Sequence, residues 1–229
     1  MATFVVAHGA WSAGWAWKKM YPLMQARGHR LITPTMTGLG ERAHLARPDI
    51  DLETHIADIL GVLTIEDLSG VNLIGHSYGG MVATGVADRA RSRIAKLIYL
   101  DAFAPNDGDS VTDLLPASAR AMRTPSSDGM IPPVPMPPDT PAEDSAWCAP
   151  RRLPQPALTF EQKLTLQNGM LTLPRHYIYC RRIAPDDRFR RFYERDKREG
   201  WGTSEIDSSH NPHITCPEVL ADLLDRIAV

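Results

Sequence analysis

The sequence NLIGHSYGGM, residues 72–81, places a serine between two glycines in the pentapeptide GHSYG, residues 75–79. Residues 71–74 are mostly apolar, which is typical of a buried strand, and residues 81–90 have the apolar spacing of a helix. Between a strand and a helix, a G-x-S-x-G turn presents its serine hydroxyl at the edge of the sheet. We therefore predict that Ser77 is a nucleophile, the alternative being a small residue in a tight turn.

A second turn of interest follows the short apolar run of residues 3–7, which leads into His8-Gly9-Ala10. Loops that follow adjacent parallel strands lie at the same edge of a sheet, where such folds bind ligands. We therefore predict that the backbone N–H groups of Ala10 and Tyr78 donate together to an oxyanion. The alternative for this turn is that it only ends the strand.

A general base for Ser77 is expected among the eight histidines of the chain. In sites with this serine turn, the base follows a late strand. His210 and His213 both follow the strand predicted at residues 203–207. Because His210 comes first, we predict that it is the base, and that His213 orients the loop or caps the last helix.

The rest of the chain alternates between strand-like and helix-like segments. Strands are predicted at residues 3–7, 29–34, 71–74, 93–100, 174–180 and 203–207, and helices at residues 15–26, 51–63, 81–90, 185–200 and 217–227. This alternation predicts an α/β fold with a doubly wound, mostly parallel sheet.

Prolines interrupt the alternation throughout residues 104–156. Their density excludes long helices and central strands there. Apolar side chains lie between these prolines, and a solvated linker has no use for them. We therefore predict a cap or lid insertion at residues 104–169 over a core formed by residues 1–103 and 170–229. A disordered linker is the alternative.

The composition excludes several classes of protein. The chain has 229 residues, is 43% hydrophobic and 23% charged, and has a net charge of −2, so neither nucleic acid nor an anionic membrane surface is an expected partner. It has no apolar run long enough to span a membrane, and its first residues contain no basic and apolar stretch, so we expect neither a membrane span nor a leader. Cys148, Cys180 and Cys216 form no C-x-x-C pair. We therefore expect reduced thiols, a cytoplasmic location, and neither a metal nor an organic cofactor. The oligomeric state stays open, with a homodimer as one possibility.

Four segments together resemble a known family. They are VVAHGAWSAGWAW (5–17), GHRLITPTMTGLGERAHL (28–45), LIGHSYGGMVATGVADR (73–89) and SSHNPHIT (208–215). The chain resembles the α/β-hydrolase superfamily, in particular the branch of plant methyl-ester esterases, hydroxynitrile lyases and bacterial carboxylesterases. The resemblance covers nearly all of the chain except the proline-rich segment. It implies an α/β-hydrolase fold with Ser77 and His210 as catalytic residues and with Ala10 and Tyr78 as oxyanion donors.

The carboxylate of a catalytic triad is the point at which this chain departs from the family pattern. The usual position follows the strand that ends at Cys180, but the next acids there are Asp186 and Asp187. Asp101, in YLDAF, lies 24 residues after Ser77, and some α/β-hydrolases are known to place the acid at this strand end. We predict that Asp101 is the acid. The alternatives are Asp186 or Asp187, no acid at all, or an Asp101 that only anchors the cap through an ion pair.

The resemblance also bears on the reaction. Hydroxynitrile lyases typically carry threonine and lysine at the positions of Gly9 and Asn211, so ester hydrolysis is favoured over lyase chemistry. We predict a carboxylesterase-type serine hydrolase that cleaves small to medium apolar esters through an acyl-enzyme without a cofactor. The alternatives are a hydroxynitrile lyase, a hydrolase of thioesters or carbon–carbon bonds, and a ligand receptor that does not catalyse.

Overall fold

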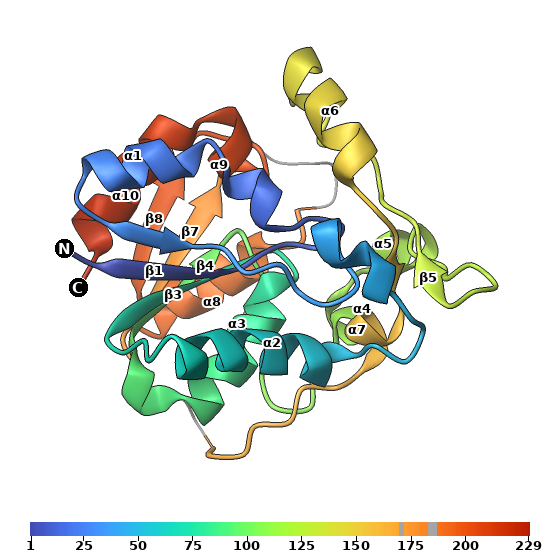
Figure 1. The fold of residues 1–229 in the computed structure, drawn as a ribbon, viewed down its shortest axis with the longest axis horizontal. Helices are drawn as coiled ribbons and strands as arrows, with labels where there is room; N and C mark the ends of the chain where they lie inside the picture. The colour runs from blue at the N-terminus through green and yellow to red at the C-terminus, as the bar shows by residue number, and fades with distance from the viewer. Residues whose placement is uncertain (170–171, 183–186) are drawn as a thin grey trace.

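A six-stranded parallel sheet forms the centre of the computed structural model, which describes residues 1–169, 172–182 and 187–229 (Figure 1). The strand order is β2-β1-β3-β4-β7-β8, and every pairing in it is parallel. Its strands are β1 (Thr3–Ala7), β2 (Arg30–Ile32), β3 (Val71–His76), β4 (Ile94–Leu100), β7 (Arg175–Cys180) and β8 (Gly202–Ile206). The predicted α/β fold with a doubly wound, mostly parallel sheet is confirmed.

Helices cover both faces of this sheet. One face carries α1 (Met20–Ala26) and α10 (Pro217–Ile227), and the other carries α2 (Leu52–Ile65), α3 (Gly79–Arg89) and α8 (Arg190–Arg198) (Figure 1). Short 3-10 helices are η1 (Gly14–Trp17), η2 (Gly40–Leu45), η3 (Arg91–Arg93) and η4 (Ala149–Arg151), and α9 (Pro212–Thr215) joins β8 to α10. None of the helices formed by the described residues has the length and hydropathy of a membrane span.

The strands send alternate side chains into two apolar cores, one on each face. Val5 and Leu73 belong to the core beneath α2 and α3, whereas Phe4 and Ile74 belong to the core beneath α1 and α10. Every residue of β3 is buried. A strand that is covered on both faces needs a continuous apolar run, which is why these segments lack the alternation of a half-exposed strand.

Two predicted helices begin later than expected. The segment 15–26 divides into η1 and α1, because the Pro22 ring in the first turn of α1 would clash with the carbonyl of Lys18 if the helix began earlier. The segment predicted at 185–200 forms α8 from Arg190, where the Asp187 carboxylate accepts the backbone N–H of Arg190 at 3.1 Å. Residues 183–186 lie outside the described residues.

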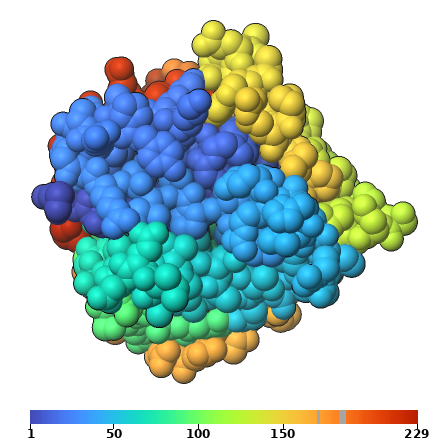
Figure 2. Space-filling model, viewed as in Figure 1, coloured from blue at the N-terminus to red at the C-terminus, as the bar shows by residue number. Residues whose placement is uncertain are grey.

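The predicted cap, residues 104–169, consists of short elements at the carboxyl ends of the strands (Figure 1). They are α4 (Val111–Leu114), α5 (Ala117–Ala121), β5 (Met130–Ile131), α6 (Ala142–Cys148), β6 (Gln155–Pro156) and α7 (Leu158–Glu161). Figure 2 shows α6 projecting from the outline of the molecule. The short elements agree with the density of prolines. The exact boundaries between core and cap stay a prediction.

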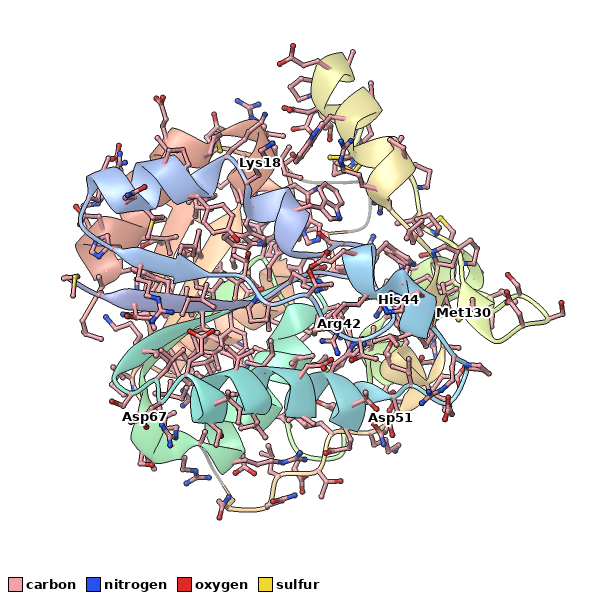
Figure 3. All side chains as sticks on the ribbon, viewed as in Figure 1. Lys18, Arg42, His44, Asp51, Asp67 and Met130 are labelled. Carbon is pink, nitrogen blue, oxygen red and sulfur yellow. The ribbon has the colours of Figure 1, made fainter. Side chains whose placement is uncertain are left out.

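The start of α2 is tied to the cap segment through Asp51, which is labelled in Figure 3. One oxygen of the Asp51 carboxylate accepts the backbone N–H of Thr54 at 2.8 Å and thereby caps the helix. Its other oxygen accepts the side-chain amide of Gln162 at 2.9 Å. One carboxylate therefore stabilises a core helix and holds the chain just after α7 against it.

Candidate active site

Ser77 lies in the turn between β3 and α3, in the left-handed conformation with φ of 55°. This conformation is strained for a residue with a side chain, and it persists only where its surroundings hold it. The Ser77 N–H donates to the carbonyl of Leu100 at 3.3 Å, and the Ser77 carbonyl accepts from the N–H of Phe103 at 3.1 Å. Both bonds come from the β4 end, so the neighbouring strand fixes the turn.

The glycines of the turn permit a close approach of strand and helix. A Cβ atom on Gly79 would lie 2.0 Å from the carbonyl oxygen of Ala7, and one on Gly75 would lie 2.7 Å from the Cα atom of Gly80. Side chains at these positions would therefore push α3 away from β1 and β3. The two glycines of the motif thus place the beginning of α3 directly beside Ser77.

His210 bridges Ser77 and Asp101. Its Nε2 atom lies 2.8 Å from the Ser77 hydroxyl oxygen, and its Nδ1 atom lies 2.7 Å from one carboxylate oxygen of Asp101. A carboxylate only accepts, so Nδ1–H donates to Asp101 and Nε2 is left to accept the proton of Ser77. The structure therefore brings together the three residues predicted as nucleophile, base and acid.

Asp101 is held as firmly as the serine. It is 5% exposed and has a φ of 43°, in the left-handed region. Its other carboxylate oxygen accepts the backbone N–H of Cys180 at 3.2 Å. Burial raises the pKa of the Asp101 carboxyl, and the Cys180 N–H opposes that rise. Among the described residues, the basic side chain that its carboxylate contacts is His210, and it forms no ion pair with the cap.

The alternative acid Asp187 has other partners. One of its oxygens accepts the Tyr179 hydroxyl at 2.7 Å, and the other accepts the N–H of Arg190 at the start of α8. It therefore does not orient His210 in this structure. Asp186, the other alternative, lies outside the described residues.

Burial and positive charge keep His210 neutral. Burial lowers the pKa of His210, and the guanidinium groups of Arg188, Arg152 and Arg123 lower it further. A neutral imidazole can accept a proton, so His210 is in the state that a general base requires at neutral pH.

Two backbone N–H groups are available beside Ser77. Ala10, in the loop after β1, lines the same cavity as Ser77, and Tyr78 is the next residue in the turn. In the part of the chain that the structure describes, neither backbone N–H has a hydrogen-bond acceptor. Unengaged donors beside a serine hydroxyl are what an oxyanion site requires.

The side chain of Tyr78 is fixed by His55, a residue that no sequence motif placed in the site. His55 Nε2 donates to the carbonyl of Thr37 at 2.9 Å, so Nδ1 accepts the hydroxyl of Tyr78, also at 2.9 Å. The Tyr78 ring stacks on Phe160 with centroids 5.6 Å apart. The position of His55 on the buried face of α2 is the signal that could have identified it.

His76 and His213 pack behind the base. His76 Nε2 donates to the backbone carbonyl of His210 at 2.9 Å, so it supports the loop that carries the imidazole. His213 stacks on Trp17 with centroids 4.5 Å apart. Of the two predicted roles of His213, the one as cap of the last helix is wrong, because His213 lies within α9 and Cys216 occupies the N-cap position of α10.

The burial of His213 predicts how stability depends on pH. Burial lowers its pKa well below the ordinary 6.5, so below pH 6.5 the unfolded chain takes up a proton that the folded chain excludes. Stability is then lost as the pH falls, by about 1.4 kcal/mol per pH unit for such a group. We expect His213→Phe, which keeps an aromatic ring but cannot titrate, to reduce by that amount the slope of unfolding free energy against pH between pH 6 and 5.

Urea unfolding of both proteins at pH 7.5, 6.0 and 5.0 measures this difference. At pH 7.5, where His213 is neutral in the folded and the unfolded chain, the difference in unfolding free energy gives the effect of His213→Phe on packing alone. Parallel curves for the two proteins would show that His213 does not contribute to the acid sensitivity.

A cavity of about 560 Å³ opens beside the triad. Its core side includes Gly9, Ala10, Trp11, Trp15, Ser77, His210 and Asn211, and its cap side includes Met122, Arg123, Val134, Met136, Pro137, Cys148 and Arg152. The volume suits a small to medium organic molecule. Among the described residues, no group of three His, Cys, Asp or Glu side chains could hold a metal ion.

Comparisons with known proteins agree with the fold. Residues 4–223 match the family model described as alpha/beta hydrolase family. The carbendazim hydrolyzing esterase of Nocardioides sp. (strain SG-4G) is 38% identical over 239 residues, which cover 98% of each chain. Methylesterase 8 of Arabidopsis thaliana is 27% identical over 120 residues, which cover 52% of this chain and 44% of that protein.

Solved structures give the same architecture. An extracellular alpha/beta-hydrolase from a Paenibacillus species has a TM-score of 0.88 at 24% identity and covers 100% of this chain and 99% of its own. An Arabidopsis methylesterase has a TM-score of 0.78 at 23% identity and covers 99% of this chain and 98% of its own. At these identities, the likeness concerns the fold.

Proposed function

The chain belongs to the alpha/beta hydrolase family, and from this premise we propose that it is a serine hydrolase that cleaves small to medium, largely apolar carboxylic esters through an acyl-enzyme. The observation that carries the proposal is the contact of His210 with both Ser77, at 2.8 Å, and Asp101, at 2.7 Å. The relatives named as esterases support ester hydrolysis as the reaction.

The first half of the proposed reaction forms the acyl-enzyme. The Ser77 oxygen attacks the ester carbonyl while His210 Nε2 takes its proton, and the Asp101 carboxylate stabilises the resulting imidazolium. The N–H groups of Ala10 and Tyr78 donate to the carbonyl oxygen as it becomes an oxyanion. When the tetrahedral intermediate collapses, the carbon–oxygen bond to the alcohol breaks and His210 returns the proton to the departing alcohol.

The second half releases the acid. A water molecule takes the place of the alcohol, and His210 removes one of its protons as it attacks the acyl carbon. Collapse of the second tetrahedral intermediate breaks the bond to Ser77, and the proton on His210 returns to the serine oxygen. The products are one alcohol and one carboxylic acid, and the residues named here supply every proton transfer.

A direct comparison of reactions tests this proposal. We expect the protein to hydrolyse p-nitrophenyl butyrate and methyl butyrate, and to release no cyanide from mandelonitrile above the background rate, because the position after His210 is the neutral Asn211. The absorbance of released p-nitrophenol measures hydrolysis of the first ester, methanol release measures hydrolysis of the second, and cyanide release measures cleavage of mandelonitrile. Cyanide release faster than ester hydrolysis would replace the esterase assignment with that of a lyase.

A further inference from the structure

Arg152 extends a positive charge from the cap segment into the wall of the cavity. It follows η4, its side chain is partly buried, and its Nη1 donates to the backbone carbonyl of Val134. Its guanidinium carbon lies 5.7 Å from the ring centroid of Trp11. Trp11 and Arg152 both line the cavity that Ser77 opens into, so this cation lies in the wall of the proposed substrate site.

The charge of Arg152 has no carboxylate partner within the described ranges. The acids in the cavity wall are Asp101, which binds His210, Asp187, which binds Tyr179, and the exposed Asp139. Burial lowers the pKa of the Arg152 guanidinium, as expected for a cation that is partly removed from water without a counter-charge. Such a group is costly to the free protein and is retained most readily where a ligand supplies the negative charge.

The adjacent Arg151 shows the ordinary arrangement of an arginine in this segment. It is exposed, lies over the Trp147 ring at 5.1 Å, and is absent from the cavity wall. Of these two neighbouring arginines, Arg152 faces the cavity and Arg151 does not.

Trp11 is held rigidly beside Arg152. Its φ is 54°, in the left-handed region, where a residue with a side chain is strained. Its backbone N–H donates to the Gln155 side chain at 3.0 Å, and its indole N–H donates to the carbonyl of Ile131 at 2.9 Å. Both acceptors belong to the cap segment, so these two bonds fix the orientation of the indole ring. A second guanidinium, that of Arg123, lies 5.6 Å from the ring centroid of Trp11.

We propose that the cavity selects esters that carry a free carboxylate at the far end of a largely apolar acyl chain, and that Arg152 binds this carboxylate. The inference rests on the proposed esterase function. Guanidinium and carboxylate form two parallel, charge-assisted hydrogen bonds, and partial burial strengthens them. Val134, Met136 and Pro137 line the cavity and suit a methylene chain. Monoesters of dicarboxylic acids have this chemistry.

Matched ligands test the proposal in the Ser77→Ala variant, which cannot form the acyl-enzyme and therefore leaves the esters intact during a titration. The ligands are the monomethyl esters of the dicarboxylic acids from succinic to suberic acid, each paired with the primary amide of the same length. We expect isothermal titration calorimetry to give, for at least one chain length, a Kd about ten-fold or more lower for the acid than for its amide. The chain length with the largest ratio reports the distance from Ser77 to the guanidinium.

Two further variants assign this preference to Arg152. In the Ser77→Ala background, Arg152→Gln is expected to bring the acid-to-amide ratio near one, whereas Arg151→Gln, with the same change of charge, keeps it. If Arg152→Gln does not fold, Arg152→Lys keeps the charge but loses the planar fork, and a reduced ratio is expected. Equal Kd values for acid and amide at every length, or equal losses in Arg151→Gln and Arg152→Gln, would overturn the proposal.

Turnover of the same esters by the unmodified enzyme separates this proposal from the function on which it rests. Hydrolysis of acids and amides at equal kcat/KM would retain the esterase and remove the carboxylate site. Selective binding of the acids with no hydrolysis of any ester would retain the carboxylate site and remove the esterase.

Discussion

Ser77→Ala is expected to lower kcat/KM for p-nitrophenyl butyrate by about 10⁴ to 10⁶-fold, which is the loss typical when a triad nucleophile is removed. The alanine cannot form the acyl-enzyme, and only the oxyanion donors and substrate binding still contribute. Initial rates at matched protein concentration measure the loss, and the rate of the uncatalysed reaction sets the lower limit.

A matched serine provides the control. Ser209 lies next to His210 in the chain, and its buried hydroxyl has no hydrogen-bond partner in the described part of the protein. Ser209→Ala therefore removes a hydroxyl near the site without breaking a hydrogen bond, and kcat/KM is expected to stay within about three-fold, since substitutions that leave such networks intact have small effects. Activity above one hundredth of wild type in Ser77→Ala would contradict the assigned nucleophile.

Asp101→Asn is expected to lower kcat by about 10⁴-fold with little change in KM. The asparagine amide can donate to Nδ1, and His210 then carries its proton on Nε2, where it cannot accept from Ser77. The loss should appear in kcat because the acid acts on the base and does not contact the substrate. Steady-state kinetics over a wide range of substrate concentration separate the two parameters.

The effect of Asp101→Asn is compared with that of removing Asp186 and Asp187, the acids near the usual family position. Asp187 already binds Tyr179 and the start of α8, so the Asp186→Asn/Asp187→Asn double variant is expected to keep kcat within about ten-fold of wild type. A loss of several orders of magnitude in the double variant, together with an active Asp101→Asn, would move the acid to the segment after β7.

The arrangement around Ser77 could be predicted because it depends on local sequence and on strand order. The spacing of residues 75–79 defines the turn, and Asp101 directly follows the strand that pairs with β3. His210 follows the last strand of the sheet. Each of these positions lies at the carboxyl end of a parallel strand, so a sequence that predicts the strands also predicts that the three side chains approach one another.

Other parts of the site depend on contacts between distant segments, for which the sequence holds no local signal. The left-handed Trp11 is held by Ile131 and Gln155, more than a hundred residues further along the chain. The support of Tyr78 by His55 requires α2 and α3 to pack in one particular way. The prolines after residue 104 predicted short elements but could not predict which side chains would reach the cavity.

Covalent labelling of the nucleophile tests the central claim most directly. The enzyme is treated with an alkyl p-nitrophenyl phosphonate, a reagent that phosphonylates an activated serine, and the adduct is located by peptide mass spectrometry. We predict one adduct per chain, on Ser77, with stoichiometric release of p-nitrophenol and parallel loss of esterase activity. An adduct on a different residue, or loss of activity without modification of Ser77, would contradict the assignment of Ser77 as the nucleophile.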